Sequence, residues 1–115
     1  MSSVTRKCVF LSGPMSGLPH YNVAAFAEAH AVMIEQGACA VYNPAMAYLS
    51  SGETYHTHEY WMRKCIGELL GDCPHYDVLV SLPGWQDSDG AKTERMVAMA
   101  CGIKCVELSE IVDGE

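Results

Sequence analysis

Four short apolar runs alternate with segments of helical periodicity, and this alternation restricts the fold more than any other feature of the chain. The apolar runs lie at residues 8–12, 39–42, 78–82 and 103–108, and the helical segments lie between them at residues 22–36, 57–71 and 90–101. Strands that alternate with helices form a parallel sheet with helices on both faces. Right-handed crossovers favour the strand order 2-1-3-4. We therefore expect an α/β fold, a flavodoxin-like or Rossmann-like three-layer sandwich around a parallel four-stranded sheet.

Length and composition limit the partners that the chain can have. Its 115 residues, half of them hydrophobic, suit a single domain over residues 1–115 that ends in a short acidic tail at residues 109–115. The net charge of −7 argues against binding to a nucleic acid polymer, which would call for a basic face. No apolar run approaches the ~20 residues of a membrane span, and the first residues lack the apolar core of a signal peptide. We expect a cytoplasmic protein with no membrane partner.

The six cysteines include no Cys-x-x-Cys pair. Cys8, Cys39 and Cys105 lie in expected strands, where free cysteine is a common small buried residue, and a cytosolic compartment keeps thiols reduced. The segment His56–Glu59 contains metal-ligand side chains, but alternating histidines in a loop before a helix more often face solvent. We expect six free thiols, no metal and no other cofactor.

The segment Pro83–Glu94 connects the third expected strand to the third expected helix. A glycine-rich turn that leads into a helix leaves backbone N–H groups free to bind an anion. Ser88 or Asp89 can cap the helix, and Glu94 lies about one turn inside it, where the helix dipole keeps a carboxylate ionised. An ordinary strand-to-helix turn with a solvated glutamate has the same pattern, so the segment alone leaves both interpretations open.

Ligands of parallel α/β sheets bind beyond the carboxyl ends of the strands, where the strand order reverses. The expected order brings three loops to that place, at residues 12–21, 43–55 and 83–90. The first of them contains Gly-Pro-Met-Ser-Gly, which is again rich in small residues and backbone donors. Two such loops side by side favour a site for a small anionic molecule.

These motifs together resemble the nucleoside 2-deoxyribosyltransferase-like superfamily. The residues that carry the resemblance span 8–108 and include Phe10–Gly17, Asn22, Phe26, Asn43, Pro44, Asp77, Leu82–Trp85, Ser88, Gly90, Ala91 and Glu94. The combination is closest to a small, uncharacterised, DUF4406-like branch with a Leu-Pro-Gly-Trp motif, which is common in phages and prophages. The resemblance implies chemistry at an N-glycosidic bond.

In that superfamily a glutamate at the start of the third helix attacks the anomeric carbon of the sugar, the base leaves, and water or a second base takes the sugar. The resemblance gives this catalytic role to Glu94. A fixed carboxylate suits the reaction because it stabilises an oxocarbenium-like transition state and then traps the sugar covalently. The implied function is an N-glycosidase for a nucleoside 5′-monophosphate, or a deoxyribosyltransferase-like enzyme, with a small-molecule nucleotide or nucleoside as its partner.

The resemblance also implies a phosphate-binding pocket. Relatives that hydrolyse 5′-monophosphates have a serine six residues before the nucleophile, where transferases have an aspartate that would repel phosphate; here that residue is Ser88. The residues implied in substrate and phosphate binding are Ser12, Gly13, Pro14, Met15, Ser16, Gly17, Trp85, Ser88, Gly90 and Ala91. Asp87 and Asp89 oppose a phosphate unless their side chains point away.

Other residues have supporting roles by the same resemblance. Met15 and Trp85 would hold the base between them, although Trp85 could equally cover its own loop. Asn22, Asn43 and Asp77 are implied as supporting residues. Asp77 opens the third strand at the end away from the site, so we interpret it as structural.

Three departures from the family count against catalysis, and the third of them counts against transfer while it leaves hydrolysis or binding alone open. Phe10 replaces a tyrosine that orients the nucleophile, and Cys65 replaces an acid in the second helix, with Glu68 as a substitute nearby. The chain is also short and lacks the C-terminal extension that reaches a neighbouring subunit in transferases. The alternative function is a non-catalytic phage protein that sequesters a nucleotide in the same pocket.

Assembly follows from the small size of the sheet. Four strands and three helices leave apolar helix surface to cover, and Trp61, Met62 and Leu69 are candidates. Members of the superfamily are dimers or larger. We expect a homodimer or higher homo-oligomer built partly on the second helix.

Overall fold

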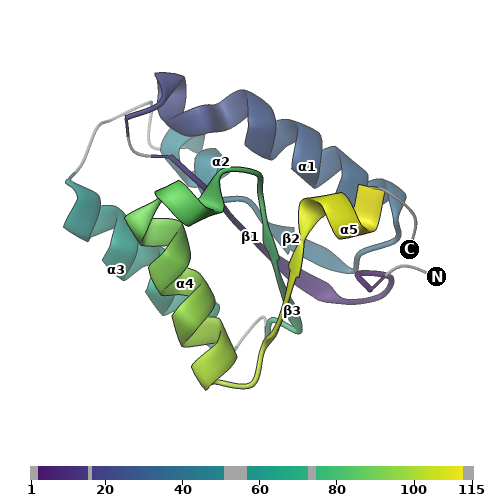
Figure 1. Ribbon diagram of the computed structural model, residues 1–115. Coiled ribbons are helices and arrows are strands. Elements are labelled where there is room, and N and C mark those ends of the chain that lie inside the picture. The colour runs from purple at the N-terminus through teal and green to yellow at the C-terminus, as the bar shows by residue number, and fades with distance from the viewer. Residues whose placement is uncertain (1–2, 16, 51–56, 73–74, 113–115) are drawn as a thin grey trace.

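The four apolar runs form one parallel sheet in the order β2-β1-β3-β4, which confirms the expected α/β sandwich (Figure 1). The computed structural model describes residues 3–15, 17–50, 57–72 and 75–112. The strands are β1 (Cys8–Ser12), β2 (Ala40–Tyr42), β3 (Val78–Ser81) and β4 (Lys104–Glu107). Central β1 pairs with β2 and β3, and β3 pairs with β4, in parallel each time.

Three helices lie where periodicity predicts them. They are α1 (Val23–Glu35), α3 (His58–Leu69) and α4 (Asp89–Ala100), and the single-turn 3-10 helices η1 (Pro19–Asn22) and η2 (Trp85–Asp87) precede α1 and α4. Side-chain caps explain two of the starting points. Thr57 Oγ1 accepts a hydrogen bond from the Tyr60 N–H at 3.1 Å, and Ser88 Oγ accepts one from the Ala91 N–H at 3.2 Å.

Two short helices lie where the sequence predicted irregular chain. α2 (Pro44–Ser50) occupies part of the predicted loop, and α5 (Leu108–Val112) occupies part of the predicted acidic tail. Asn43 and Pro44 do end β2, but they also start a helix. Asn43 Oδ1 accepts a hydrogen bond from the Ala45 N–H at 3.0 Å, and proline suits the first helical turn. α5 is held against the rest of the fold by Ile111, whose side chain is buried in the core.

Alternate side chains of β1 and β3 point to opposite faces of the sheet. Val9, Leu11 and Val80 pack on one face, against α1 and α5. Phe10 and Leu79 pack on the other face, against α3 and α4. Figure 1 shows the two helix pairs on either side of the sheet, so the architecture has three layers.

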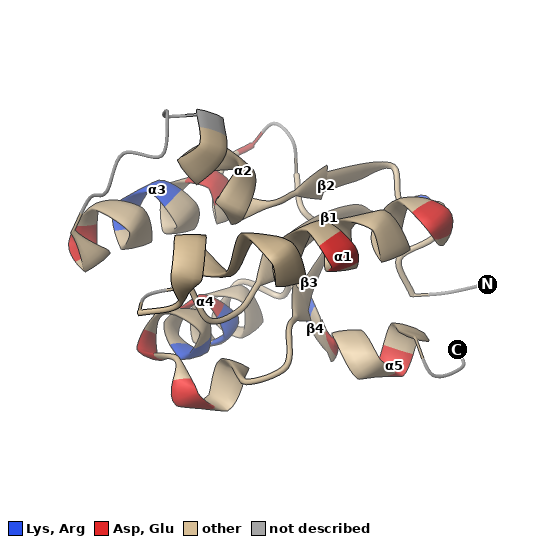
Figure 2. Cartoon of the chain, turned by 90° about the horizontal axis from the view of Figure 1, so that it is seen from above, with Lys and Arg blue, Asp and Glu red and all other residues tan. Residues whose placement is uncertain are grey.

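Charged side chains lie on the outside of the molecule, with one exception. Figure 2 shows acidic positions on α1, α3, α4 and α5, with basic positions interspersed among them. Among the described residues, Glu94 is the one charged side chain that is buried. No helix in the described part of the chain is long and apolar enough to cross a bilayer.

Five cysteines fall within the described ranges and are free thiols: Cys8, Cys39, Cys65, Cys101 and Cys105. Cys73 and His56 lie outside those ranges. Cys39 was expected inside a strand, but it lies just before β2 and is exposed. No group of three or more histidine, cysteine, aspartate or glutamate side chains in the described ranges could hold a metal ion.

The residues expected at an oligomer interface have other places in the fold. Trp61 and Leu69 are buried within the chain, and Met62 is half-buried. α4 exposes Met96 and Met99 instead. A homo-oligomer stays a prediction, but not one built on the three residues that the sequence suggested.

Gly13→Ala should lower the free energy of unfolding by ~1–3 kcal/mol, because a Cβ at residue 13 would lie 2.7 Å from Leu82 Cβ in a packed loop. Urea denaturation measures the change. Gly67→Ala is the matched control, since an added Cβ on this exposed residue of α3 meets no atom within 4 Å and alanine favours a helix. A Gly13→Ala protein as stable as the parent would contradict the close contact with Leu82.

Candidate functional site

Glu94 lies in the second turn of α4 and has only 7% of its surface exposed. Ser12 Oγ donates a hydrogen bond to Glu94 Oε1 at 2.6 Å. Burial raises the pKa of Glu94 from 4.5 to about 7, although hydrogen bonds from Ser12 and Cys65 act in the opposite direction. Removal from water therefore opposes the helix dipole, which was expected to keep this carboxylate ionised.

Two serines at the ends of neighbouring strands set the position of α4. Ser12 of β1 and Ser81 of β3 are in register, and both are buried. Ser12 bonds to Glu94, and Ser81 Oγ accepts a hydrogen bond from Arg95 Nη1 at 3.0 Å. Two consecutive residues of α4 are thus tied to two adjacent strand ends. This arrangement fixes the rotation of the helix and with it the direction of Glu94.

A cavity of about 530 Å³, with Glu94 in its wall, opens beyond the carboxyl ends of β1 and β3. Its volume lies within the roughly 300–1,000 Å³ of small-molecule sites. The loop between β1 and α1 contributes Gly13, Pro14, Met15 and Leu18. The first three of these are residues that the family resemblance implied.

The start of α4 forms a second wall. Ser88, Gly90 and Ala91 line the cavity together with Glu94, as the sequence predicted. Ser88 caps the helix, so its hydroxyl is held beside the N–H groups that the first helical turn leaves free. A hydroxyl and backbone donors at a helix N-terminus are groups that can bind an anion.

α3 supplies a third wall, which sequence analysis missed. His58, Trp61, Met62 and Cys65 line the cavity. From the sequence, His58 was expected to face solvent, and Trp61 and Met62 were expected at an oligomer interface. Their spacing of three and four residues was a signal for one helix face, but it could not show what that face meets.

Cys65 contacts Glu94 from the side of α3. Burial and the neighbouring Glu94 carboxylate raise the pKa of the Cys65 thiol to about 12, so the thiol stays protonated and can donate to Glu94. Burial also raises the pKa of Tyr42, and the Tyr42 hydroxyl lies near Cys65. Within the described residues, this buried hydroxyl makes no hydrogen bond of good geometry. Glu68 is not a substitute acid here, because it accepts a hydrogen bond from Tyr76 Oη at 2.6 Å and is not among the described residues that line the cavity.

A left-handed turn holds the loop between β1 and α1. Residues 20–22 have φ angles of 47°, 53° and 63°, which are costly for residues other than glycine. Asn22 makes no capping bond to α1; its Nδ2 instead donates to the Pro14 carbonyl at 3.0 Å. The buried Tyr21 ring packs 5.6 Å from the Trp61 ring. Asn22 thus supports the loop that forms the first wall.

Trp85 is not among the described residues that line the cavity. The guanidinium carbon of Arg95 lies 4.5 Å from the centre of its ring, and Trp85 Nε1 donates a hydrogen bond to Glu107 Oε1 at 3.3 Å. These contacts hold the ring toward β4. Of the two residues expected to hold a base, only Met15 lines the cavity.

Two residues implied in phosphate binding, Ser12 and Gly17, are not among the described residues that line the cavity. Ser12 is fully buried as the hydrogen-bond donor to Glu94. Gly17 is exposed and does not line the cavity. Ser16 lies outside the described residues.

Asn43 and Asp77 are structural. Besides starting α2, Asn43 donates from Nδ2 to the Phe26 carbonyl at 3.4 Å. Asp77 Oδ2 accepts a hydrogen bond from the Cys8 N–H at 2.9 Å, at the amino end of the sheet. This agrees with the structural interpretation of Asp77 and places it away from the cavity.

The aspartates beside Ser88 both line the cavity, and both are exposed. The Asp89 side chain is 93% exposed and its Oδ1 lies 3.5 Å from Lys92 Nζ, so its charge is partly balanced. Both carboxylates oppose a phosphate in the cavity, and solvent and Lys92 weaken the repulsion from Asp89.

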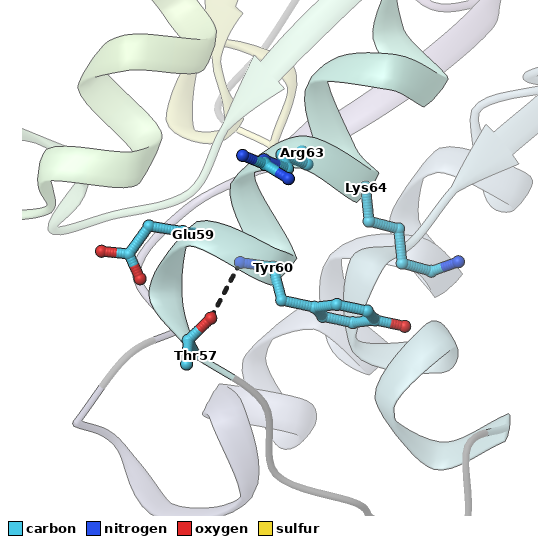
Figure 3. Close-up of a pocket in the computed structure, with 5 residues that line it drawn as sticks. All are labelled: Thr57, Glu59, Tyr60, Arg63 and Lys64. Carbon is cyan, nitrogen blue, oxygen red and sulfur yellow. Dashed lines mark hydrogen bonds between the residues drawn. The ribbon is translucent and has the colours of Figure 1, made fainter.

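A second hollow, of about 600 Å³, lies on the outer side of α3. Figure 3 shows the residues that line it, which are Thr57, Glu59, Tyr60, Arg63 and Lys64. In Figure 3 Glu59 points to one side of the helix, and Tyr60 and Lys64 point to the other. All five come from α3 and its cap and are exposed, and the Thr57 hydroxyl already serves as the helix cap, so the hollow is not the candidate site.

Residues 7–107 match the family model described as a domain of unknown function, DUF4406. The chain belongs to this family. No curated protein matches the sequence. Membership covers the whole sheet and all three walls of the cavity, and it leaves the link to the nucleoside 2-deoxyribosyltransferase-like superfamily a prediction.

Glu94→Gln should change stability in a pH-dependent way. An acid whose pKa rises from 4.5 to about 7 on folding costs little below pH 4.5 and progressively more up to about pH 7, because burial opposes the deprotonation that the unfolded chain undergoes. The variant should match the parent at pH 4.5 and exceed it by roughly 3 kcal/mol above pH 8. Urea denaturation across this pH range measures the difference.

Glu28→Gln, on the exposed surface of α1, is the control and should show no such trend. A difference between Glu94→Gln and the parent that stays constant from pH 4.5 to pH 8 would contradict the buried titration.

Proposed function

We propose that the protein is an N-glycosidase that releases the base of a nucleoside 5′-monophosphate through a covalent glycosyl intermediate on Glu94. One observation carries the proposal: a buried carboxyl group, bonded by Ser12, forms part of the wall of a cavity of about 530 Å³ at the carboxyl end of the sheet. The resemblance to the nucleoside 2-deoxyribosyltransferase-like superfamily supplies the type of reaction.

The ionised form of Glu94 performs the attack in this mechanism. Ser12 holds Oε1, which leaves the second carboxylate oxygen for the bond to C1′ as the bond to the base breaks. A carboxylate with little hydration gains strongly from positive charge that develops at C1′. Water then hydrolyses the glycosyl ester and restores the carboxylate.

Ser88 and the first turn of α4 support a 5′-phosphate as the substrate's anionic group. The Ser88 oxygen already accepts the capping bond from Ala91, so its O–H remains available to donate to a phosphate oxygen. The Asp89 carboxylate, which also lines the cavity, opposes this assignment less than a buried charge would, because it is 93% exposed and lies beside Lys92. Phosphate at a helix N-terminus also gains from the helix dipole.

A nucleotide-binding protein without turnover is the second candidate. The raised pKa of Glu94 supports it, because burial disfavours the ionised form that attacks the sugar, and binding alone does not need that form. Both candidates use the same cavity, so binding data alone do not separate them.

A panel of deoxy- and ribonucleoside 5′-monophosphates, with free base measured by chromatography, tests turnover. Glu94→Gln should lower base release at least ~10³-fold, because a covalent nucleophile accounts for several kcal/mol of the barrier. Nucleotide affinity, measured by calorimetry, should survive. Base release at the parent's rate by Glu94→Gln would rule out the mechanism, and binding without release by the parent would establish the second candidate.

Ser88→Asp should weaken 5′-monophosphates by at least about tenfold through charge repulsion, and it should spare unphosphorylated nucleosides. Aspartate caps a helix as well as serine does, so α4 should keep its start. Calorimetry with a nucleotide and its nucleoside gives the ratio of affinities. Ser109→Asp, on exposed α5, controls for added charge. An unchanged ratio in Ser88→Asp would refute the phosphate assignment.

A further inference from the structure

The proposed reaction needs a proton donor as well as a nucleophile, because a base leaves as an anion unless a proton reaches it while the bond to C1′ breaks. Glu94 cannot give that proton while its carboxylate attacks the sugar. Asp87 and Asp89 line the cavity, but both are exposed to solvent, and Asp89 is paired with Lys92. The Cys65 thiol, with its pKa raised to about 12, holds its proton too tightly. An imidazole exchanges a proton near neutral pH, and His58 is the one histidine among the described residues that line the cavity.

The packing of α3 on α4 brings His58 against the start of the helix that carries Glu94. A Cβ added to Gly90 would come within 3.4 Å of His58 Cε1, so the imidazole lies against the start of α4. Gly90 and Glu94 are four residues apart on the same face of that helix, which separates them by about 6 Å along its axis. Retaining glycosidases hold their nucleophile and their acid about 5–5.5 Å apart across the bond that breaks.

The close approach of α3 to α4 explains why residue 90 is a glycine. Its missing side chain leaves room for His58 and for Met62, whose Sδ would lie 3.1 Å from an added Cβ. His58 is the first residue of α3, and Thr57 caps that helix start. The imidazole is therefore carried on a defined helix start and reaches the mouth of the cavity, while Glu94 lies deeper in the wall.

We propose that His58 is the general acid that protonates the departing base, an inference that rests on the proposed function. An imidazolium N–H of His58 gives its proton to a ring nitrogen of the base. The electron pair of the C1′–N bond goes to the base, and a Glu94 oxygen forms the new bond to C1′. In the second step water attacks C1′, Glu94 leaves as the carboxylate, and the neutral imidazole takes the proton from water. The sum is nucleotide plus water giving base plus sugar phosphate.

A substrate that needs no proton tests this role. Purines methylated at N7 carry a positive charge in the nucleotide and depart as neutral bases, so an acid gives them little help. The parent and His58→Gln are compared on deoxyadenosine and deoxyguanosine 5′-monophosphates and on the N7-methyl form of each, with spontaneous release subtracted. His58→Gln should lose at least ~100-fold in base release from the unmethylated pair and should stay within about threefold of the parent on the methylated pair.

His75→Gln is the matched control, because His75 is exposed and lies before β3, at the amino end of the sheet. It should behave as the parent does on all four substrates. Equal losses of His58→Gln on methylated and unmethylated substrates, or no loss on either, would overturn the role of His58 as an acid.

No release from any of the four purine nucleotides by the parent would also overturn the role of His58. In that case, base release from pyrimidine nucleotides in the panel described above would show that the proposed function stands without it. Absence of release from purines and pyrimidines alike would overturn both.

Discussion

The hydrogen bond between Ser12 and Glu94 joins the end of the central strand to the helix that follows β3, and the site depends on it. A carboxyl group taken out of water loses hydration worth several kcal/mol. The donors Ser12 and Cys65 offset part of that loss, and the pKa of Glu94 near 7 reflects what remains. Ser12 is fully buried, so water cannot replace the bond unless the sheet or the helix moves. Strand β1 and helix α4 thus hold in place a carboxyl group, that of Glu94, whose burial costs free energy.

Much of this architecture could be predicted because it rests on local patterns. Period-2 and period-3.6 repeats of apolar residues mark the strands and the three long helices, and handedness rules then give the strand order. The position of Glu94 follows from the same reasoning, since a helix that starts at Ser88 places a residue six positions later in its second turn. The two short helices escaped prediction because each has fewer residues than a periodic pattern needs.

The parts that could not be predicted depend on contacts between distant segments. The face of α3 that carries His58 and Met62 is apparent from spacing, but only the packing on α4, made close by Gly90, brings it to the cavity. Trp85 turns toward β4 because Arg95 and Glu107 happen to meet it there. Reasoning from the helix dipole alone left Glu94 ionised, since burial is a property of the whole fold.

The free-energy cost of ionising the buried Glu94 has a use in the proposed reaction. No lysine or arginine lines the cavity among the described residues, so ionised Glu94 has no fixed counter-charge there. Positive charge that develops at C1′ would provide one in a poorly hydrated site, and this stabilisation arises only as the bond to the base breaks. A solvated glutamate would gain far less, because water already balances its charge. A protein that only sequestered anionic nucleotides would bind them better with a neutral or basic residue in place of Glu94, so an ionised Glu94 has a use in the proposed turnover that it lacks in storage.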